Sequence, residues 1–357
     1  MVMIIENATP SASGQDATRP SPQPDPSPAL LFDTINAYQR TAAIKAGIEL
    51  DVFTAVADGP ANAPTIANRC SASPRGIRIL CDNLVVLGFL TKSGEHYALT
   101  MDSAVFLSRK SPAYAGGTLQ FLLSDDLRGG FERLTESVRK GGTAQSAEGT
   151  IAPEHQVWIS FARSMGPLMA PAAAGLADLI PLDQSRPSKV LDISASHGMW
   201  GIEFAKKNPR SHLVALDWAT VLEVSLENAR ASGLEARFST IAGSAFDVDL
   251  GTGYDVILVP NFLHHFNPAD CVRFLKRAHA ALRPGGTVAI VEFVPGSDRV
   301  TPPGPASFSI VMLATTPQGD AYTFAEYSDM LAQAGFAPPT QQSLPASMNV
   351  AVIAKSS

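Results

Sequence analysis

The stretch VLDISASHGMWGIEFA, Val190–Ala205, runs from an apolar strand into a helix through a loop of small residues. This order is typical of nucleoside-binding α/β proteins, because a ligand can approach the loop backbone and the first turn of the helix closely. Dinucleotide-binding proteins need the pattern G-x-G-x-x-G here, so that the pyrophosphate can touch the backbone. This loop has Ser194, Ser196 and one glycine, Gly198, so the pattern does not match.

Downstream of this stretch, strand and helix patterns alternate. Apolar runs predict strands at residues 189–193, 212–217, 237–243, 254–260, 287–294, 340–346 and 348–355, the last two as an antiparallel hairpin. Helical periodicity predicts helices at residues 199–207, 219–231, 270–282 and 324–334, the third stopped by Pro284-Gly285-Gly286. We therefore expect an α/β fold with a Rossmann-like sheet, seven-stranded and mostly parallel, with helices on both faces.

Composition divides the chain into four predicted parts. Residues 1–29 are rich in Pro, Ser, Ala and Asp and have little to bury, so we expect a disordered tail. Residues 30–110 combine helical patterns with a hairpin, residues 111–185 are helix-rich, and residues 186–357 hold the sheet. We interpret the third part as a linker that also forms a pocket wall.

The pattern of residues 30–110 predicts a winged-helix unit, with three helices and a wing. Pro74 begins its longest helix after the N-cap Ser73, and Thr65 caps a shorter one. The hairpin that forms the wing is predicted to turn at Ser93-Gly94.

Charge argues against a nucleic-acid partner. The chain has 357 residues and a formal net charge of -6, so no excess of cations is available to replace phosphate counterions. The third helix of the N-terminal unit has only Arg75 and Arg78 as cations, against Asp82. We therefore expect this unit to form a dimer rather than to bind DNA.

Cysteine usage and hydropathy indicate a soluble cytoplasmic protein. The three cysteines, Cys70, Cys81 and Cys271, are widely spaced, which fits neither a disulfide framework nor a metal site. No apolar run approaches the roughly 18 residues that span a bilayer, and the N-terminus lacks a basic segment followed by an apolar one. We expect reduced thiols, no metal and no membrane association.

The residues that end each predicted strand should form the ligand site, because ligands of open α/β sheets bind at the carboxyl ends of the strands. Asp217 ends the second strand, where a carboxylate can accept both hydroxyls of a ribose. S-adenosylmethionine carries a ribose but no phosphate, so its loop needs less glycine than a dinucleotide loop. We assign to the cofactor site Asp192, Ser194, Ser196, Gly198, Asp217, Trp218, Gly243, Ser244, Ala245, Phe246 and Asn261.

At these residues the chain resembles the class I S-adenosylmethionine-dependent O-methyltransferases with an N-terminal winged-helix dimerisation domain, such as caffeic acid and acetylserotonin O-methyltransferases. The resemblance runs from about Leu31 to the C-terminus. The family's loop, Asp-x-Gly-x-Gly-x-Gly, is matched by Asp192, Ser194, Ser196 and Gly198, so two glycines are serine. If either position required a positive φ, serine there would cost about 1 to 2 kcal/mol.

The resemblance is most specific in the segment FLHHFNPADCVRFLKRAHAALRPGGTVAIVEF, residues 262–293. It implies that His264 is the catalytic base and that Glu292 orients it. The chemistry agrees, because a phenol has a pKa of about 10 and an imidazole of pKa about 6.5 can take its proton during attack on a methyl group. The resemblance also implies a small-molecule acceptor and a homodimer.

The chain departs from the family pattern at two further positions. A lysine on the fourth strand of many plant members is replaced by Pro260. A second acid is expected after MLATTPQGD, where the chain has Ala321 beside Asp320. We assign the acceptor pocket to Phe161, Met165, His265, Met312, Thr315 and Thr316.

The sequence therefore predicts a homodimeric methyltransferase that acts on a hydroxyl of a small, aromatic secondary metabolite. Because a fold does not fix the acceptor atom, a C-, S- or N-methyltransferase stays an alternative. A winged-helix regulator that only binds S-adenosylmethionine is a rival from another class. An inactive scaffold subunit is a third possibility, given the missing glycines and lysine.

Overall fold

The computed structural model describes residues 26–357, which divide into two compact units between Gly116 and Gly117. Most of the predicted tail, residues 1–25, lies outside the described residues. Ala29, the last residue of that predicted tail, already begins helix α1.

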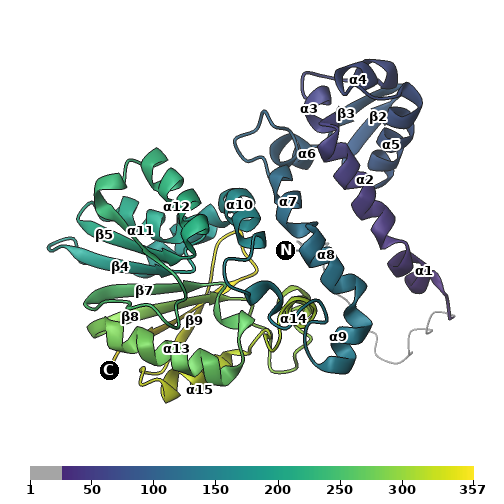
Figure 1. Ribbon diagram of the computed structural model, residues 1–357. Helices are drawn as coiled ribbons and strands as arrows, with labels where there is room; N and C mark the ends of the chain where they lie inside the picture. The colour runs from purple at the N-terminus through teal and green to yellow at the C-terminus, as the bar shows by residue number, and fades with distance from the viewer. Residues whose placement is uncertain (1–25) are drawn as a thin grey trace, which may run out of the picture. The chain divides into compact units, whose positions relative to one another are not determined.

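The N-terminal unit contains short helices and a small sheet (Figure 1). Its elements are α1 (Ala29–Ile35), α2 (Ala37–Glu49), α3 (Val52–Val56), β1 (Ala61–Asn62), α4 (Ala63–Arg69), α5 (Pro74–Val86), β2 (Leu90–Ser93), β3 (His96–Leu99) and α6 (Met101–Phe106). The three strands are antiparallel in the order β1-β3-β2. A 3-10 turn, η1 (Gly116–Thr118), spans the boundary to the second unit.

Two local predictions in this unit are off by a few residues. The N-cap of α4 is Asn62, whose side chain accepts the N–H of Thr65 at 3.0 Å, so Thr65 is the capped residue rather than the cap. Ser93 pairs with His96, which puts the hairpin turn at Gly94-Glu95, one residue later than predicted. The cap of α5 agrees with the prediction, since Ser73 accepts a backbone N–H in the first turn.

The C-terminal unit holds the main sheet. Its helices are α7 (Leu119–Leu122), α8 (Asp125–Glu132), α9 (Leu134–Lys140), η2 (Gly149–Ile151), α10 (Val157–Leu179), α11 (Met199–Lys207), α12 (Ala219–Ala231), η3 (Glu235–Arg237), η4 (Leu263–His265), α13 (Pro268–Ala281), α14 (Pro303–Thr315) and α15 (Phe324–Gln333). Its strands are β4 (Ser188–Ile193), β5 (Ser211–Asp217), β6 (Phe238–Ala242), β7 (Tyr254–Pro260), β8 (Leu282–Glu292), β9 (Thr340–Ser343) and β10 (Val350–Lys355).

The sheet has seven strands in the order β6-β5-β4-β7-β8-β10-β9. Strands β4 to β8 pair in parallel, and β10 runs antiparallel to both β8 and β9. The order reverses after β4, which is where a doubly wound sheet opens a crevice at its carboxyl edge. The predicted fold class is confirmed.

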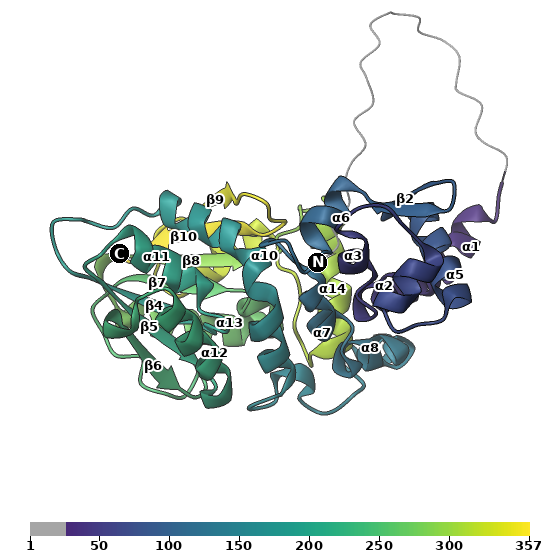
Figure 2. The same ribbon diagram turned by 90° about the horizontal axis from the view of Figure 1, so that it is seen from above.

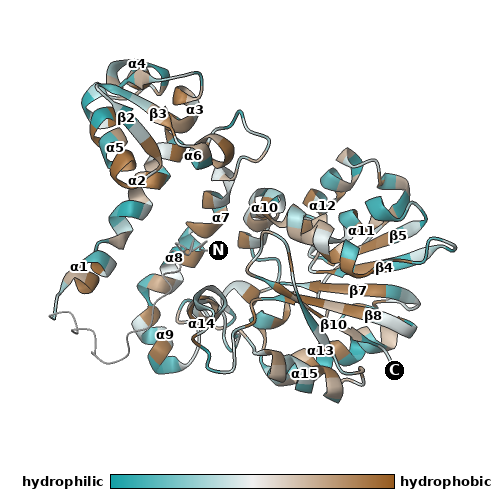
Figure 3. Cartoon of the chain, turned by 180° about the vertical axis from the view of Figure 1, so that it is seen from behind, coloured by the Kyte–Doolittle hydropathy of each residue, from teal (hydrophilic) through white to brown (hydrophobic). Residues whose placement is uncertain are grey.

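Helices cover both faces of this sheet, with α11 and α12 on one side and α13 and α15 on the other (Figure 1). The central strands β7 and β8 are largely hydrophobic (Figure 3), as expected for parallel strands covered on both faces. Helices α10 and α14 lie beside the same end of the sheet (Figures 1 and 2).

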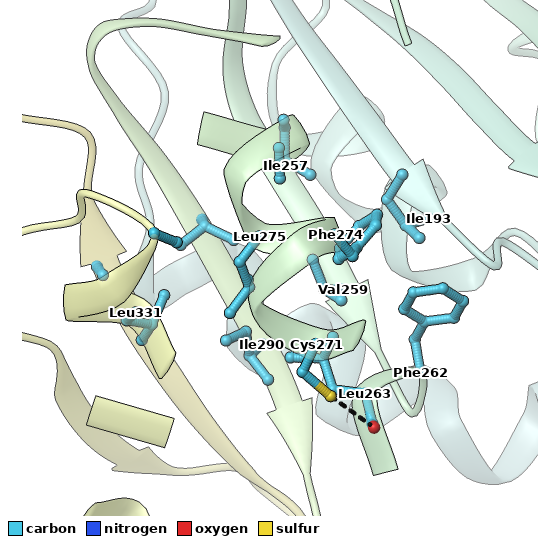
Figure 4. Close-up of a cluster of buried hydrophobic side chains, with 14 of the residues drawn as sticks. Ile193, Ile257, Val259, Phe262, Leu263, Cys271, Phe274, Leu275, Ile290 and Leu331 are labelled. Carbon is cyan, nitrogen blue, oxygen red and sulfur yellow. Dashed lines mark hydrogen bonds between the residues drawn. The ribbon is translucent and has the colours of Figure 1, made fainter. Parts of the chain in front are cut away.

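The core under α13 also fixes the segment that follows β7. Phe262 and Leu263 pack against Phe274 and other apolar side chains (Figure 4). In the same cluster, the buried Cys271 thiol donates a hydrogen bond to the Leu263 carbonyl at 3.2 Å. The short helix η4 is therefore anchored to the core on the side away from the crevice.

One sheet prediction needs correction. The segment Pro284-Gly285-Gly286 does not separate a helix from a strand, because it lies inside β8, which already begins at Leu282. The register between β7 and β8 shifts after Tyr254, and Gly285 has φ +70°. Pro284 and the two glycines thus form an irregularity near the start of the strand, where Arg283 lies at the amino edge of the sheet.

No helix within residues 26–357 is long and apolar enough to cross a membrane. Cys70, Cys81 and Cys271 are all free thiols in this part of the chain.

Candidate active site

The loop between β4 and α11 alternates between ordinary and left-handed backbone. Ser194 has φ +51°, Ser196 has φ +52° and Gly198 has φ +75°. A Cβ at Gly198 would also lie 3.1 Å from that of Ser225, so glycine is required there on two grounds. The two serines thus keep the shape that glycine favours, at a cost of about 1 to 2 kcal/mol for each.

Asp217, the last residue of β5, ties this loop to the sheet. Its carboxylate accepts the N–H of Ser196 at 2.8 Å and that of Trp218 at 2.7 Å. Burial raises the pKa of Asp217 to about 6, and the two backbone donors oppose the rise. This carboxylate lines the cavity described below, where a ribose could reach it.

Asp192 has a different position from the other predicted cofactor residues. It is fully buried, accepts the N–H of Gly201 at 3.0 Å through one oxygen, and has no partner for the other. Burial raises its pKa well above the ordinary value. Neither Asp192 nor Gly198 lines the cavity, so both act on the loop's shape.

A cavity of about 660 Å³ opens at the carboxyl edge of the sheet, within residues 121–349. One end of its wall comes from the strand ends. The predicted cofactor residues that line it are Ser194, Ser196, Asp217, Trp218, Gly243, Ser244, Ala245, Phe246 and Asn261. Pro260, which ends β7, lines it as well.

His264 and Glu292 form a buried pair beside this cavity. The His264 Nδ1 atom contacts one carboxylate oxygen of Glu292, the last residue of β8. The other carboxylate oxygen accepts the backbone N–H groups of Phe262 at 3.0 Å, Leu263 at 2.9 Å and His264 at 3.3 Å. Glu292 does not line the cavity but contacts His264, which does.

The protonation of this pair follows from its burial. Burial lowers the pKa of His264, so its imidazole is neutral at physiological pH. Burial raises the pKa of Glu292, and the three backbone N–H groups oppose the rise because they stabilise the carboxylate. When Nδ1–H donates to that carboxylate, the Nε2 atom of His264 keeps a free lone pair.

His265 also lines the cavity, with its Nδ1 atom 3.2 Å from the carbonyl of Phe262. Its ring meets that of Trp158 edge to face, at 5.1 Å between centroids. Burial lowers the pKa of His265 to about 3. The two histidines are therefore both neutral, and they differ in that only His264 is held by an acid.

The other end of the cavity is apolar and aromatic. Four of the predicted acceptor residues besides His265 line it: Phe161, Met165, Met312 and Thr315. Thr316 does not, because its hydroxyl donates to the carbonyl of Met312 and accepts the N–H of Gly319 within a turn. Its neighbour Thr315, predicted together with it, does line the wall.

Trp158 lies in the segment interpreted as a pocket wall and lines the cavity. Sequence reasoning assigned no role to several other wall residues, namely Phe121, His197, Phe308 and Asn349. His197 is buried in the loop, accepts the N–H of Met199 at Nδ1, and stacks on Phe161 at 6.0 Å between centroids. Because His197 follows Ser196 in the sequence, it could have been predicted to line the cavity. Phe308 and Asn349 come from distant segments with no comparable signal.

The acid expected after MLATTPQGD is absent from the cavity wall. Ala321 is buried, and Asp320 forms an ion pair with Arg299 at 3.3 Å. Glu292 is therefore the one acid that contacts His264 among the described residues.

Comparisons with known proteins agree with this site. The O-methyltransferase domain family matches residues 175–337, and the O-methyltransferase dimerisation domain family matches residues 32–109. The 3-hydroxy-5-methyl-1-naphthoate 3-O-methyltransferase of Streptomyces sahachiroi is 30% identical over 311 residues, which cover 86% of this chain and 89% of that protein. The chain belongs to the O-methyltransferase family. The predicted enzyme class and the methyl donor S-adenosylmethionine are thereby confirmed.

Solved structures of this O-methyltransferase family share the fold. A crystal structure from Nostoc punctiforme PCC 73102, described as a candidate O-methyltransferase, is 53% identical, covers 92% of this chain and 99% of its own, and has a TM-score of 0.89. Human N-acetylserotonin methyltransferase in complex with S-adenosylmethionine has a TM-score of 0.80 at 22% identity, covering 94% and 99%. The second likeness shows the fold alone.

Proposed function

We propose that this O-methyltransferase methylates a hydroxyl group of a small, uncharged aromatic molecule and that His264 removes the proton. The observation that carries this proposal is the buried His264–Glu292 pair, whose imidazole faces a cavity with aromatic walls. A neutral imidazole with a free Nε2 atom is the form that a general base requires.

The strand-end residues fit S-adenosylmethionine. Asp217 offers a carboxylate to ribose hydroxyls, and the loop of Ser194 and Ser196 offers small side chains and close backbone. The buried hydroxyl of Ser196 has no partner among the described residues 26–357, as expected of a site that awaits a polar ligand. Gly243 to Phe246 would border the adenine. When bound, S-adenosylmethionine supplies an electrophilic methyl group.

The protein's own contribution to the chemistry is to position the acceptor and take its proton. The acceptor hydroxyl donates to Nε2 of His264, and the proton moves to that nitrogen as the oxygen becomes the nucleophile. Glu292 holds the ring in the required tautomer and stabilises the imidazolium that forms. Holding both reactants in one closed cavity supplies much of the remaining acceleration.

The cavity wall favours an uncharged acceptor. Among the described residues that line the cavity, none is lysine or arginine, and the acids are Glu148, Asp217 and Asp247. His197, His264 and His265 have lowered pKa values because of burial, so they add no positive charge at neutral pH. An acceptor carboxylate would be buried without a cation, which is unfavourable.

We also infer that residues 30–110 form a winged-helix unit through which two chains form a homodimer. Five large apolar side chains of α1 and α2 are 57% to 78% exposed: Leu30, Leu31, Phe32, Ile35 and Tyr38. Such a group is typical of an interface. The domain limits 111–185 and 186–357 and a cytoplasmic location remain predictions.

The experiment that tests the proposal compares acceptors and a base-deficient variant. Purified protein is supplied with labelled S-adenosylmethionine and with a phenol, a thiol or an amine of the same aromatic skeleton. We expect the phenol to be methylated and His264→Ala to lose more than about 100-fold in turnover. Transfer to the thiol or amine alone, or turnover of His264→Ala within tenfold of the parent, would reject the proposal.

His265→Ala is the matched control, since His265 is the next residue of η4 and lines the same cavity. We expect this variant to raise KM more than it lowers kcat, because His265 has no acid partner.

A further inference from the structure

Ser196 carries an unusual hydroxyl. It is the one buried hydroxyl on the cavity wall that has no hydrogen-bond partner among residues 26–357. The residue is 8% exposed, so solvent does not satisfy this group. By contrast, the hydroxyl of Thr315 on the same wall donates to the carbonyl of Val311 at 2.8 Å.

The backbone makes serine at this position still less expected. Ser196 has φ +52°, a conformation that glycine adopts without strain. Glycine here would remove both the strain and the unpaired hydroxyl. A serine that is unfavourable on both counts in the unliganded protein calls for a compensating interaction in the liganded one.

The position of Ser196 indicates what that interaction is. Its backbone N–H donates to Asp217, so Ser196 adjoins the carboxylate that we propose binds a ribose, and both residues line the cavity. The ligand that fits this end of the cavity, S-adenosylmethionine, carries oxygen atoms in its ribose and in its amino-acid carboxylate.

We propose that the Ser196 hydroxyl binds S-adenosylmethionine directly, donating its hydrogen to one of these oxygen atoms. The inference rests on the proposed cofactor site and adds a contact that a glycine loop cannot make. In this chain the contact offsets the unfavourable backbone at Ser196.

The test is calorimetric titration of the full chain with S-adenosylhomocysteine, using Ser196→Ala and Ser196→Gly. Alanine removes the hydroxyl and keeps the strain, whereas glycine removes both. We expect each variant to bind about tenfold more weakly than the parent. Binding of both variants within twofold of the parent would overturn the inference. If Ser196→Ala fails to fold, Ser196→Gly still decides, because glycine suits this backbone.

Ser71→Gly is the control for strain alone. Ser71 has φ +50°, is exposed, belongs to the N-terminal unit and is not among the residues that line the cavity. We expect this variant to unfold at a higher temperature and to leave the affinity for S-adenosylhomocysteine unchanged. A tenfold loss in Ser71→Gly would show that the losses at position 196 are not specific, and would overturn the inference.

A second ligand identifies the oxygen atom. Titration with 5′-methylthioadenosine, which has the ribose but no amino-acid part, should show a loss in the Ser196 variants if the ribose is bound. The loss should be confined to S-adenosylhomocysteine if the carboxylate is bound. A parent protein that binds neither ligand would refute the proposed function itself, whereas a parent that binds while its variants match it refutes only this inference.

Discussion

Buried acids at the two edges of the main sheet differ in their hydrogen-bond partners and in the direction of their pKa shifts. At the amino edge, Asp255 at the start of β7 contacts Arg186 and Arg283 and accepts the N–H of Lys189 at 2.8 Å. Burial raises the pKa of Asp255, but these three hydrogen bonds outweigh it, and its pKa lies below the ordinary value. This acid is ionised and satisfied within the protein.

At the carboxyl edge, Asp192, Asp217 and Glu292 are equally buried but have no arginine or lysine partner in the described chain. Burial raises the pKa of all three. Their partners are backbone N–H groups and one histidine.

From this difference we infer that Asp255 serves stability, whereas Asp217 serves the cofactor and Glu292 serves His264. A carboxylate already paired with two guanidinium groups has little capacity left for a substrate or cofactor. A carboxylate held only by backbone donors keeps lone pairs for a ribose or a histidine, and the fold bears the cost of its burial.

Glu292→Gln should have the largest effect. Glutamine keeps an oxygen for the three backbone N–H groups of η4 but presents an amide N–H to Nδ1 of His264. The ring then carries its proton on Nε2 and cannot act as a base, so we expect kcat to fall about 1000-fold. Steady-state kinetics at saturating acceptor measures this.

The control for Glu292→Gln is the double variant with His264→Ala. Residues that act as a unit are not additive, so the double variant should be no slower than the slower single variant. Calorimetry should show unchanged affinity for S-adenosylhomocysteine. A further large loss in the double variant would show that Glu292 acts independently of His264.

Asp255→Ala should lower stability rather than activity. It leaves the N–H of Lys189 without its partner and removes the contacts of Arg186 and Arg283. Because the two arginines are 39% and 43% exposed, solvent compensates for part of the loss. We expect a loss of about 2 kcal/mol in the free energy of unfolding, or about 5 °C in Tm.

Asp183→Ala is the matched control for Asp255→Ala, since Asp183 contacts the same Arg186 at 3.4 Å but is 48% exposed. Its effect should be below about 0.5 kcal/mol. Both variants should keep the kcat of the parent. A loss of turnover in folded Asp255→Ala would contradict the division between the two edges.

The same comparison shows what the sequence could reveal. The carboxyl edge was predictable because each strand and the polar residue at its end are neighbours in sequence, as with β5 and Asp217 or β8 and Glu292. The fold followed from the same local alternation. The amino-edge cluster was not predictable, because Arg186, Asp255 and Arg283 meet only through the pairing of β4, β7 and β8.

Other features that the sequence did not predict also depend on how separate segments fold and pack together. The irregularity that includes Gly285 depends on the register between β7 and β8, which the pattern of one segment does not specify. The aromatic wall combines α10 with Phe308 of α14 and with Asn349, which are far apart in sequence. The sequence did not specify the positive φ of Ser194 and Ser196, because the backbone angles of this loop depend on how it packs between β4 and α11.

Asp217→Asn should weaken cofactor binding. The amide has one acceptor where the carboxylate uses two, so either the N–H of Ser196 or that of Trp218 loses its partner, and a ribose loses a charged acceptor. We expect S-adenosylhomocysteine to bind about tenfold more weakly by calorimetry. At saturating cofactor, kcat should stay near that of the parent. A dissociation constant within twofold of the parent would remove Asp217 from the cofactor site.

The smallest expected effect is the change in affinity for S-adenosylhomocysteine with pH. The sign of the pKa shift behind it distinguishes Asp217 at the carboxyl edge from Asp255 at the amino edge. With a pKa of about 6, Asp217 is about nine-tenths ionised at pH 7 and about one-quarter at pH 5.5. If the ionised form binds the ribose, the affinity for S-adenosylhomocysteine should fall about fourfold over this range. Asp217→Asn, measured by the same titration, should abolish the change. An unaltered pH dependence in that variant would assign the titration to another group.

In the unliganded protein, the contribution of Asp217 to stability should change with pH in the opposite direction to the affinity for S-adenosylhomocysteine. A carboxyl whose pKa is raised by folding binds more protons in the folded state, so its contribution to stability falls as pH rises from about 4 to 6. Asp255, whose pKa is lowered by folding, contributes fully above its ordinary pKa and loses that contribution only in more acidic solution. Between pH 5.5 and 7, Tm of the Asp217→Asn variant should therefore change less with pH than that of the parent. Asp255→Ala should leave the pH dependence of the parent unchanged over this range.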